Sequence, residues 1–214
     1  MNDYRISGDE GILIDADTCT PLSSQMSVNA GGPLTPLFAV IHYTAGRSLG
    51  QTVSWLSNPR SRASAHLVIG RDGEVVQLVP FNRQAWHAGR SKWTVETSYG
   101  SHTYLGLNQH SIGIELENYG KLALPVPVSG GRQTWFGRPV PDDEIHIDMS
   151  GSWHRYTEKQ IQACLEVCEI LFNEYDLHDI LGHSDIAPRK LDPGPAFPMD
   201  NFRAHLLGRK ELCE

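Results

Sequence analysis

Proline dominates one segment near the C-terminal end of the chain, residues 182–198, with the sequence GHSDIAPRKLDPGPAFP. Proline fixes the backbone angle φ and lacks an N–H donor, which excludes the segment from helices and from the interior of a sheet. We therefore predict a rigid loop. This loop carries His183, Lys190 and Asp192 at fixed spacing. A stiff loop with these side chains can hold a metal ion or a reaction centre.

Size and charge limit what the chain can be. Its 214 residues fit one domain, and a domain of this size can fold without a disulfide framework. A net charge of −7 argues against a nucleic-acid-binding protein, which would show a basic surface. The N-terminal sequence MNDYRISGDE is polar, unlike a signal peptide, and no apolar run reaches the roughly 18 residues of a membrane-spanning helix. We expect a protein without an integral membrane segment that is cytoplasmic when synthesised.

Two apolar runs predict strands of a central sheet. Residues 37–43 (LFAVIHY) are β-branched and apolar and indicate a buried strand that ends at His42. Within residues 108–118 (NQHSIGIELEN), isoleucine and leucine alternate with glutamate, which places Glu115 and Glu117 on the opposite face. A carboxylate on the inner face of a central strand needs a partner or a function. The alternative is a pair of solvent-facing glutamates on an edge strand.

A hairpin and a tight turn follow the first strand. Residues 63–70 and 74–80 flank an Asp-Gly turn, which predicts a β-hairpin with His66 in its first strand. The small residues of the turn QAWHAG, residues 84–89, leave two side chains free to face a cleft: Trp86 and His87.

Helical periodicity appears in three segments. The longest predicted helix covers residues 156–175 and begins with a capping box formed by Thr157 and Gln160. Shorter helices are expected at 48–58, where Trp55 would belong to the apolar side, and at 200–207. Strands that alternate with helices, together with one hairpin, predict an α/β fold with a central mixed β-sheet flanked by helices.

Three segments lack a regular pattern. We expect residues 1–36 to be an irregular N-terminal segment, apart from a short strand at 11–15, and residues 91–104 to form a loop. Residues 120–152 are rich in proline and glycine and form a connection longer than a compact domain needs, which is typical of a functional or mobile segment. The domain core then covers about 37–206.

These residues permit metal-assisted hydrolysis. His42, His183 and Asp192 would supply three ligands and leave a fourth position open, which is the pattern of a catalytic zinc site. Zinc produces a reactive water near neutral pH and polarises a carbonyl oxygen. Glu115 is suited to act as the base, and Lys190 to stabilise an oxyanion. The implied reaction is amide hydrolysis.

A second metal chemistry uses the neighbouring carboxylate. His183 and Asp185, with His205 as a distant partner, could form the facial triad of a non-haem iron enzyme. Asp185 could instead form a hydrogen bond within the turn or cap it.

Five segments in order along the chain resemble the zinc-dependent N-acetylmuramoyl-L-alanine amidases, the amidase type 2 and peptidoglycan recognition protein-like family. The segments are VIHYTAG (40–46), SAHLVIGRDGEVVQLVP (64–80), AWHAG (85–89), SIGIELEN (111–118) and GHSDIAPRKLDPGPAFP (182–198). The resemblance implies the fold of that family and a single amidase domain over residues 1–214, with the branch that includes the cell-wall-recycling amidase as the nearest pattern.

The resemblance also implies a set of site residues. The zinc ligands of the family fall on His42, His183 and Asp192, its catalytic glutamate on Glu115, and its catalytic lysine on Lys190. It further implies four residues that bind the substrate: Trp86, His87, His66 and Asn118.

The substrate implied by the resemblance is peptidoglycan or a muropeptide, cleaved between N-acetylmuramic acid and L-alanine. A non-catalytic peptidoglycan-binding module is the alternative from another class. Three settings stay open: recycling of muropeptides inside a bacterium, a phage endolysin released by lysis, and an effector exported by a dedicated secretion system. The segment 120–152 could shape the groove, gate it or form an oligomer contact.

Overall fold

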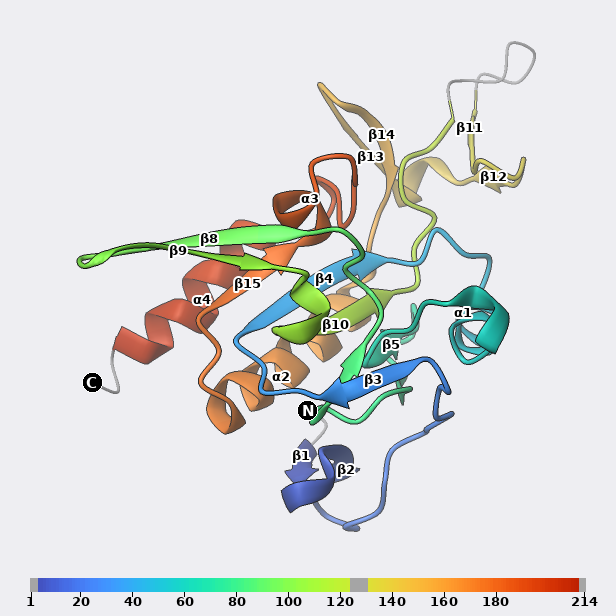
Figure 1. Cartoon of the computed structure of the whole chain (residues 1–214). Coiled ribbons are helices and arrows are strands. Elements are labelled where there is room, and N and C mark those ends of the chain that lie inside the picture. The colour runs from blue at the N-terminus through green and yellow to red at the C-terminus, as the bar shows by residue number, and fades with distance from the viewer. Residues whose placement is uncertain (1–3, 124–130, 212–214) are drawn as a thin grey trace.

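A five-stranded sheet with the strand order β15-β4-β10-β5-β6 lies at the centre of the computed structural model, which describes residues 4–123 and 131–211 (Figure 1). Its strands are β4 (Phe38–Tyr43), β5 (Leu67–Ile69), β6 (Val75–Gln77), β10 (Ser111–Leu116) and β15 (Asp179–Gly182). The first four strands of that order run parallel, and β6 pairs antiparallel with β5. The predicted mixed sheet and its hairpin are therefore confirmed, with shorter hairpin strands than expected.

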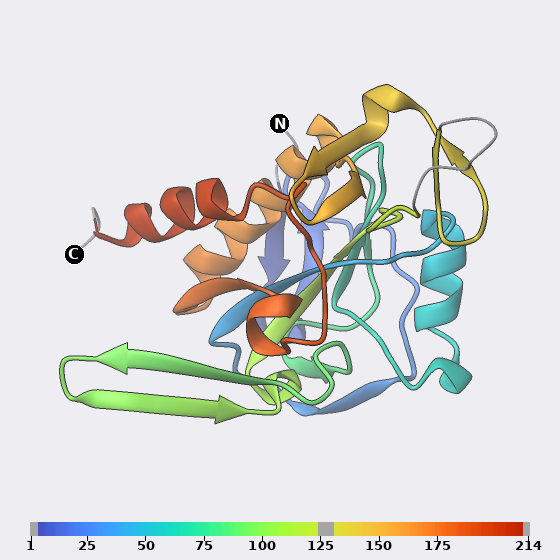
Figure 2. The same ribbon diagram turned by 90° about the horizontal axis from the view of Figure 1, so that it is seen from above.

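One face of the sheet packs against a long helix. Ala39 and Ile41 of β4 and Ile112 and Ile114 of β10 are fully buried and share a core cluster with residues of α2 (Glu158–Glu174). Each buried isoleucine contributes roughly 1.5–3 kcal/mol relative to an exposed one. A second helix, α4 (Met199–Glu211), packs beside α2 and against β15 (Figure 2).

Side-chain caps fix where two helices begin. The Thr157 side chain accepts a hydrogen bond from the Gln160 N–H, and the Gln160 side chain accepts one from the Thr157 N–H. The Ser48 side chain accepts a hydrogen bond from the Gln51 N–H and caps α1 (Leu49–Leu56). Such caps are typically worth about 1 kcal/mol each. Both predicted helix starts are confirmed.

The other face of the sheet leads to the candidate site. Because side chains alternate along a strand, Phe38 and Val40 point away from α2 and join a separate core cluster that includes Leu181. The same alternation brings His42 and Glu115 to this face, at the carboxyl ends of parallel strands, which is where ligands collect in such sheets.

A long hairpin replaces the loop expected at residues 91–104. Strands β8 and β9 pair antiparallel along their whole length and extend away from the sheet (Figure 1). At the inner end, the Tyr104 ring meets the Phe38 ring edge-on, with 5.1 Å between centroids. Polar residues face solvent on much of the hairpin, and its partly buried residues are Trp93, Val95 and Tyr104, which pack against the core cluster that contains Phe38. The strands are β8 (Lys92–Thr97) and β9 (Gly100–Leu105).

The N-terminal segment, expected to be mostly irregular, contains short elements. Strands β1 and β2 form a hairpin, and β3 pairs with β7. The strand expected at 11–15 is confirmed, and residues 16–29 form no helix or strand, as expected, whereas β1, η1 and β3 were not predicted. The elements are β1 (Tyr4–Ser7), η1 (Gly8–Glu10), β2 (Ile12–Asp15), β3 (Ala30–Pro33) and β7 (Arg83–Ala85). Two further short helices connect elements of the core: η2 (Pro59–Ser61) and η3 (Leu107–Gln109).

The long connection after β10 forms a small unit of its own, here called the insertion and defined as residues 119–155. Its positions 124–130 lie outside the described residues. Two short hairpins pack around Tyr119, Leu122 and Ile145 (Figure 1). The elements are β11 (Arg132–Gln133), β12 (Pro139–Val140), η4 (Asp142–Glu144), β13 (Ile145–Asp148) and β14 (Gly151–His154).

The proline-rich segment is not a loop over its whole length. Its first residue ends β15, and α3 (His183–Ile186) forms one helical turn before Pro188. The prediction of a continuous loop was wrong at this end because the prolines begin only after that turn. Within residues 4–123 and 131–211, none of the helices combines the length and apolarity needed to cross a membrane.

Candidate metal centre and active site

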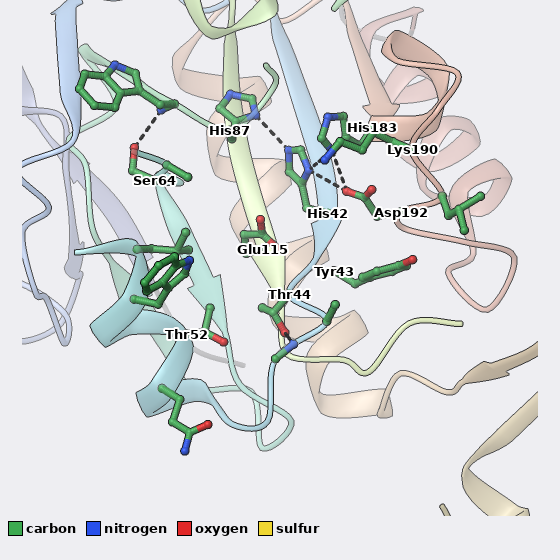
Figure 3. A pocket seen from close by; sticks show the side chains of 18 of the residues that line it. His42, Tyr43, Thr44, Thr52, Ser64, His87, Glu115, His183, Lys190 and Asp192 are labelled. Carbon is green, nitrogen blue, oxygen red and sulfur yellow. Dashed lines mark hydrogen bonds and ion pairs between the residues drawn. The ribbon is translucent and has the colours of Figure 1, made fainter. Parts of the chain in front are cut away.

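Three buried side chains converge at the carboxyl ends of β4 and β15. His42 is the last residue but one of β4, His183 is the first residue of α3, and Asp192 lies in the loop that follows α3 (Figure 3). Nδ1 of His42, Nδ1 of His183 and Oδ2 of Asp192 form a triangle with every side 2.9 Å long. The structure therefore brings together the three ligand residues predicted from the sequence.

This triangle fits a metal ion. Three atoms that each offer a lone pair repel one another at 2.9 Å unless protons or a cation lie between them. Two imidazole nitrogens and a carboxylate oxygen form a donor set that suits catalytic zinc, with a further position left for water or substrate. Burial alone would raise the pKa of Asp192, but hydrogen bonds from His183 and His42 hold that pKa below its ordinary value. The carboxylate is thus ionised at neutral pH, as a ligand must be.

His87 contacts His42, one corner of the triangle. Nε2 of His42 lies 3.0 Å from Nδ1 of His87, and Nε2 of His87 lies 3.3 Å from the Ser111 carbonyl oxygen. An imidazole that offers Nδ1 to a metal carries its proton on Nε2, so His42 can donate to His87, and His87 to Ser111. Burial holds the pKa of His87 well below its ordinary value and keeps this ring neutral. A side chain at Gly113 would collide with the His87 ring, so glycine makes room for it.

Glu115 lies beside the triangle because of strand register. It pairs with His42 across the parallel strands β10 and β4, and its Oε2 atom is buried without a hydrogen-bond partner among the described residues. Burial and the charge of Asp192 raise the pKa of Glu115 to about 8, against an opposing effect of Lys190. A carboxylate in this range can accept and return a proton near neutral pH. The alternative of solvent-facing glutamates on an edge strand is wrong for Glu115, because β10 is central.

The raised pKa of Glu115 predicts how metal-free protein responds to pH. An acid whose pKa rises from 4.5 to about 8 on folding stabilises the folded state fully below pH 4.5 and loses that contribution as pH rises through 8. In chelated protein, Glu115→Gln should remove roughly 4 kcal/mol of the fall in unfolding free energy between pH 5 and 8.5. Urea unfolding at both pH values measures this difference, with Glu117→Gln as the matched control. An unchanged fall in the Glu115 variant would contradict a buried, protonated Glu115.

A cleft of about 700 Å³ opens over the triangle and Glu115. The exposed residue Lys190 lines this cleft. Trp86 and Trp55 line it as well. Trp86 is 37% exposed and Trp55 56% exposed, which leaves two flat aromatic surfaces open to a ligand. Trp86 is thus where the sequence placed it. Trp55 was expected on the apolar side of its helix, but the buried residues of α1 include Val53 and Leu56 and not Trp55. The spacing of Val53 and Leu56 by three residues could have shown this, because it defines one face of the helix and Trp55 does not lie on it.

Two predicted substrate-binding residues do not line the cleft. His66 accepts a hydrogen bond at Nδ1 from the Gly113 N–H at 2.9 Å, and its Nε2 lies 2.9 Å from the Arg83 carbonyl oxygen. The Asn118 side chain donates to the His154 carbonyl oxygen at 3.0 Å and accepts from the Gly120 N–H at 2.7 Å. Both residues are at most 1% exposed. Their polar groups form hydrogen bonds inside the protein and fix the backbone around the site.

The residues of the alternative iron triad lie apart. Asp185 accepts hydrogen bonds from the Gly182 N–H at 2.8 Å and from Arg203 at 2.6 Å, which agrees with a role within the turn. His205 on α4 contacts Glu169 on α2, with 2.6 Å between Nε2 and Oε1. The arrangement therefore favours Asp192 over Asp185 as the carboxylate ligand.

Comparison with known proteins agrees with the fold. The family model described as N-acetylmuramoyl-L-alanine amidase (Amidase_2) matches residues 32–195, a range that contains the triangle, Glu115 and Lys190. The chain belongs to this family.

Relatives and solved structures support the same assignment. The 1,6-anhydro-N-acetylmuramyl-L-alanine amidase AmpD of Salmonella typhimurium (strain SL1344) is 36% identical over 156 residues, which are 71% of this chain and 62% of the relative. A crystal structure of a Se-Met AmpD derivative is 29% identical with a TM-score of 0.61, and the match covers 92% of this chain and 97% of that one.

A third match was solved with a ligand. AmiD from E. coli, in complex with the substrate anhydro-N-acetylmuramic acid-L-Ala-D-gamma-Glu-L-Lys, is 27% identical with a TM-score of 0.58, over 95% of this chain and 65% of that one. The chain spans about six tenths of the length of the curated AmpD relatives it matches.

Proposed function

We propose that this chain is a zinc-dependent amidase that hydrolyses the bond between N-acetylmuramic acid and L-alanine in peptidoglycan or muropeptides. The observation that carries the proposal is the His-His-Asp triangle with Glu115 beside it, at the bottom of an open cleft. Family membership and the substrate named for AmiD support this substrate class.

Each site residue has a defined task in this reaction. His42, His183 and Asp192 would hold the zinc ion, and a zinc ion bound there would lower the pKa of a water molecule and polarise a carbonyl group. Glu115 takes a proton from the attacking water and returns it to the amine of L-alanine as that amine leaves. Lys190 donates to the carbonyl oxygen as negative charge develops there. Trp86 offers its exposed face to the substrate.

The direct test is metal-dependent release of the peptide. Zinc-loaded protein should hydrolyse anhydro-N-acetylmuramic acid-L-Ala-D-γ-Glu-L-Lys and release a peptide with a free L-alanine amine, detected by amine labelling and mass spectrometry. Treatment with a chelator should lower the rate by at least about 100-fold, and zinc should restore it. Release that survives complete metal removal contradicts the proposal. Binding without any release would instead indicate a peptidoglycan-binding module.

Substrate size separates the biological settings. A preference for the soluble muropeptide over intact sacculi supports recycling inside the cell, and digestion of sacculi supports lysis or attack on a wall. Elemental analysis of the purified protein separates zinc from iron.

A further inference from the structure

The insertion touches the wall of the cleft at alternate residues. Tyr43, Ala45 and Arg47 all line the cleft. The first contact is at Tyr43, whose hydroxyl is hydrogen-bonded by the Lys121 backbone. Gly120 lies so close to the Tyr43 ring that an added Cβ would come within 2.6 Å of it, and its φ of 72° is open to glycine.

The second contact holds an unfavourable backbone conformation. Ala45 has a φ of 48°, in the left-handed region that residues with a side chain rarely adopt. The indole N–H of Trp135 donates a hydrogen bond to the Ala45 carbonyl oxygen at 2.9 Å. Strained residues persist where the surrounding structure fixes them, and they cluster at ligand sites. Trp135 therefore helps to hold the turn that leads to Arg47.

The third contact orients a charged side chain. The Arg47 guanidinium group lies over the Phe136 ring, 4.8 Å from its centroid, and Trp135 packs edge-on against Phe136 at 5.2 Å. No ion pair joins Arg47 to a carboxylate whose side chain the structure describes. Stacking on a ring leaves the N–H groups at the edge of the guanidinium free, and those groups match a carboxylate in a two-pronged contact.

The substrate class proposed above carries suitable carboxylates. In a peptide of the type L-Ala-D-γ-Glu-L-Lys, glutamate is linked through its side chain, so its α-carboxylate is free next to L-alanine, and the last residue carries a second. Within a chain of net charge −7, the cleft is lined by the cations Arg47, Arg189 and Lys190. We propose that Arg47 binds a carboxylate of the substrate's peptide, and that Trp135 and Phe136 are the positioning residues that hold it.

This inference rests on the proposed function for its substrate, and substrate variants test it. Three muropeptides are compared: the parent, one with the glutamate α-carboxylate converted to an amide, and one with the C-terminal carboxylate converted to an amide. Arg47→Gln should lower kcat/KM for the parent by about 10-fold. For the amide that lacks the carboxylate bound by Arg47, the same substitution should lower kcat/KM by less than about 2-fold. The peptide that behaves in this way identifies the carboxylate.

Binding measurements make the test independent of turnover. Calorimetry on zinc-loaded protein with Glu115→Gln, with and without Arg47→Gln, should show the same pattern in Kd. Arg138→Gln is the matched control, because Arg138 also lies over an aromatic ring of the insertion, Tyr119, but does not line the cleft. It should leave all three peptides unaffected. Phe136→Leu should lower binding of the parent by about 3-fold and leave the selected amide unchanged.

The outcomes are distinct. If the wild-type protein hydrolysed none of the three peptides, the proposed function would be refuted. The pattern of Kd values would still decide the role of Arg47. An Arg47→Gln variant that weakens all three peptides equally, or none of them, overturns the inference.

Discussion

Replacement of Glu115 by glutamine should leave zinc in place and lower kcat by roughly 10³-fold, within the range that a positioned general base contributes. The physical reason is position: Glu115 adjoins His42 through strand register, and its buried Oε2 has no partner among the described residues. Glutamine keeps the shape of the side chain but cannot accept the proton. The measurements are kcat on the soluble muropeptide and zinc per chain by elemental analysis.

Glu117 provides the control for this experiment. It follows Glu115 by two residues and accepts a long hydrogen bond from the Arg71 N–H at 3.4 Å, away from the triangle. Glu117→Gln should therefore keep turnover within about 2-fold of wild type, as is usual for surface substitutions. If Glu115→Gln retained turnover within 10-fold while binding zinc, the assignment of Glu115 as the base would be wrong.

Removal of a ligand should have a different signature, with loss of the metal itself. His183→Ala and Asp192→Ala each take away one corner of a triangle whose sides are 2.9 Å. We expect less than about 0.1 zinc per chain after dialysis and activity at least 10³-fold lower, because zinc held by two ligands is readily lost. Zinc content after dialysis and peptide release measure these effects.

Variants at His87 and His205 serve as comparisons for the ligand variants. His87→Ala removes the acceptor for the His42 Nε2–H and should weaken zinc affinity by about 10–100-fold without abolishing binding, as loss of such a partner usually does. His205→Ala should change neither zinc content nor rate. Loss of the metal in the His205 variant would revive the iron triad with Asp185.

Local rules were sufficient for much of the fold. The capping box at Thr157, the buried run that ends at His42 and the alternation around Glu115 each depend on neighbours in the sequence. The triangle needed more, because its members are separated by up to 150 positions. Its prediction came from the order of five motifs rather than from any one spacing.

The differences between expectation and structure have a common physical origin. Sequence shows that His66 and Asn118 are polar, but it does not show that their polar atoms find partners inside the protein. The hairpin of β8 and β9 was missed because most of its side chains face solvent, and its few partly buried ones, Trp93, Val95 and Tyr104, pack against a core cluster that contains the distant Phe38. Contacts between distant segments decide both cases.

The pairing of Glu115 with His42 has a consequence for how this site can change. The spacing between the proposed base and the first ligand is set by backbone hydrogen bonds between two central strands. Loops around the cleft, the insertion among them, can therefore vary in length without altering that spacing. New substrates can be acquired by remodelling the walls while the reacting groups stay fixed. A slip of the two strands by one residue would instead turn Glu115 toward α2 and end catalysis, so the sheet register is the part of this protein that tolerates least variation.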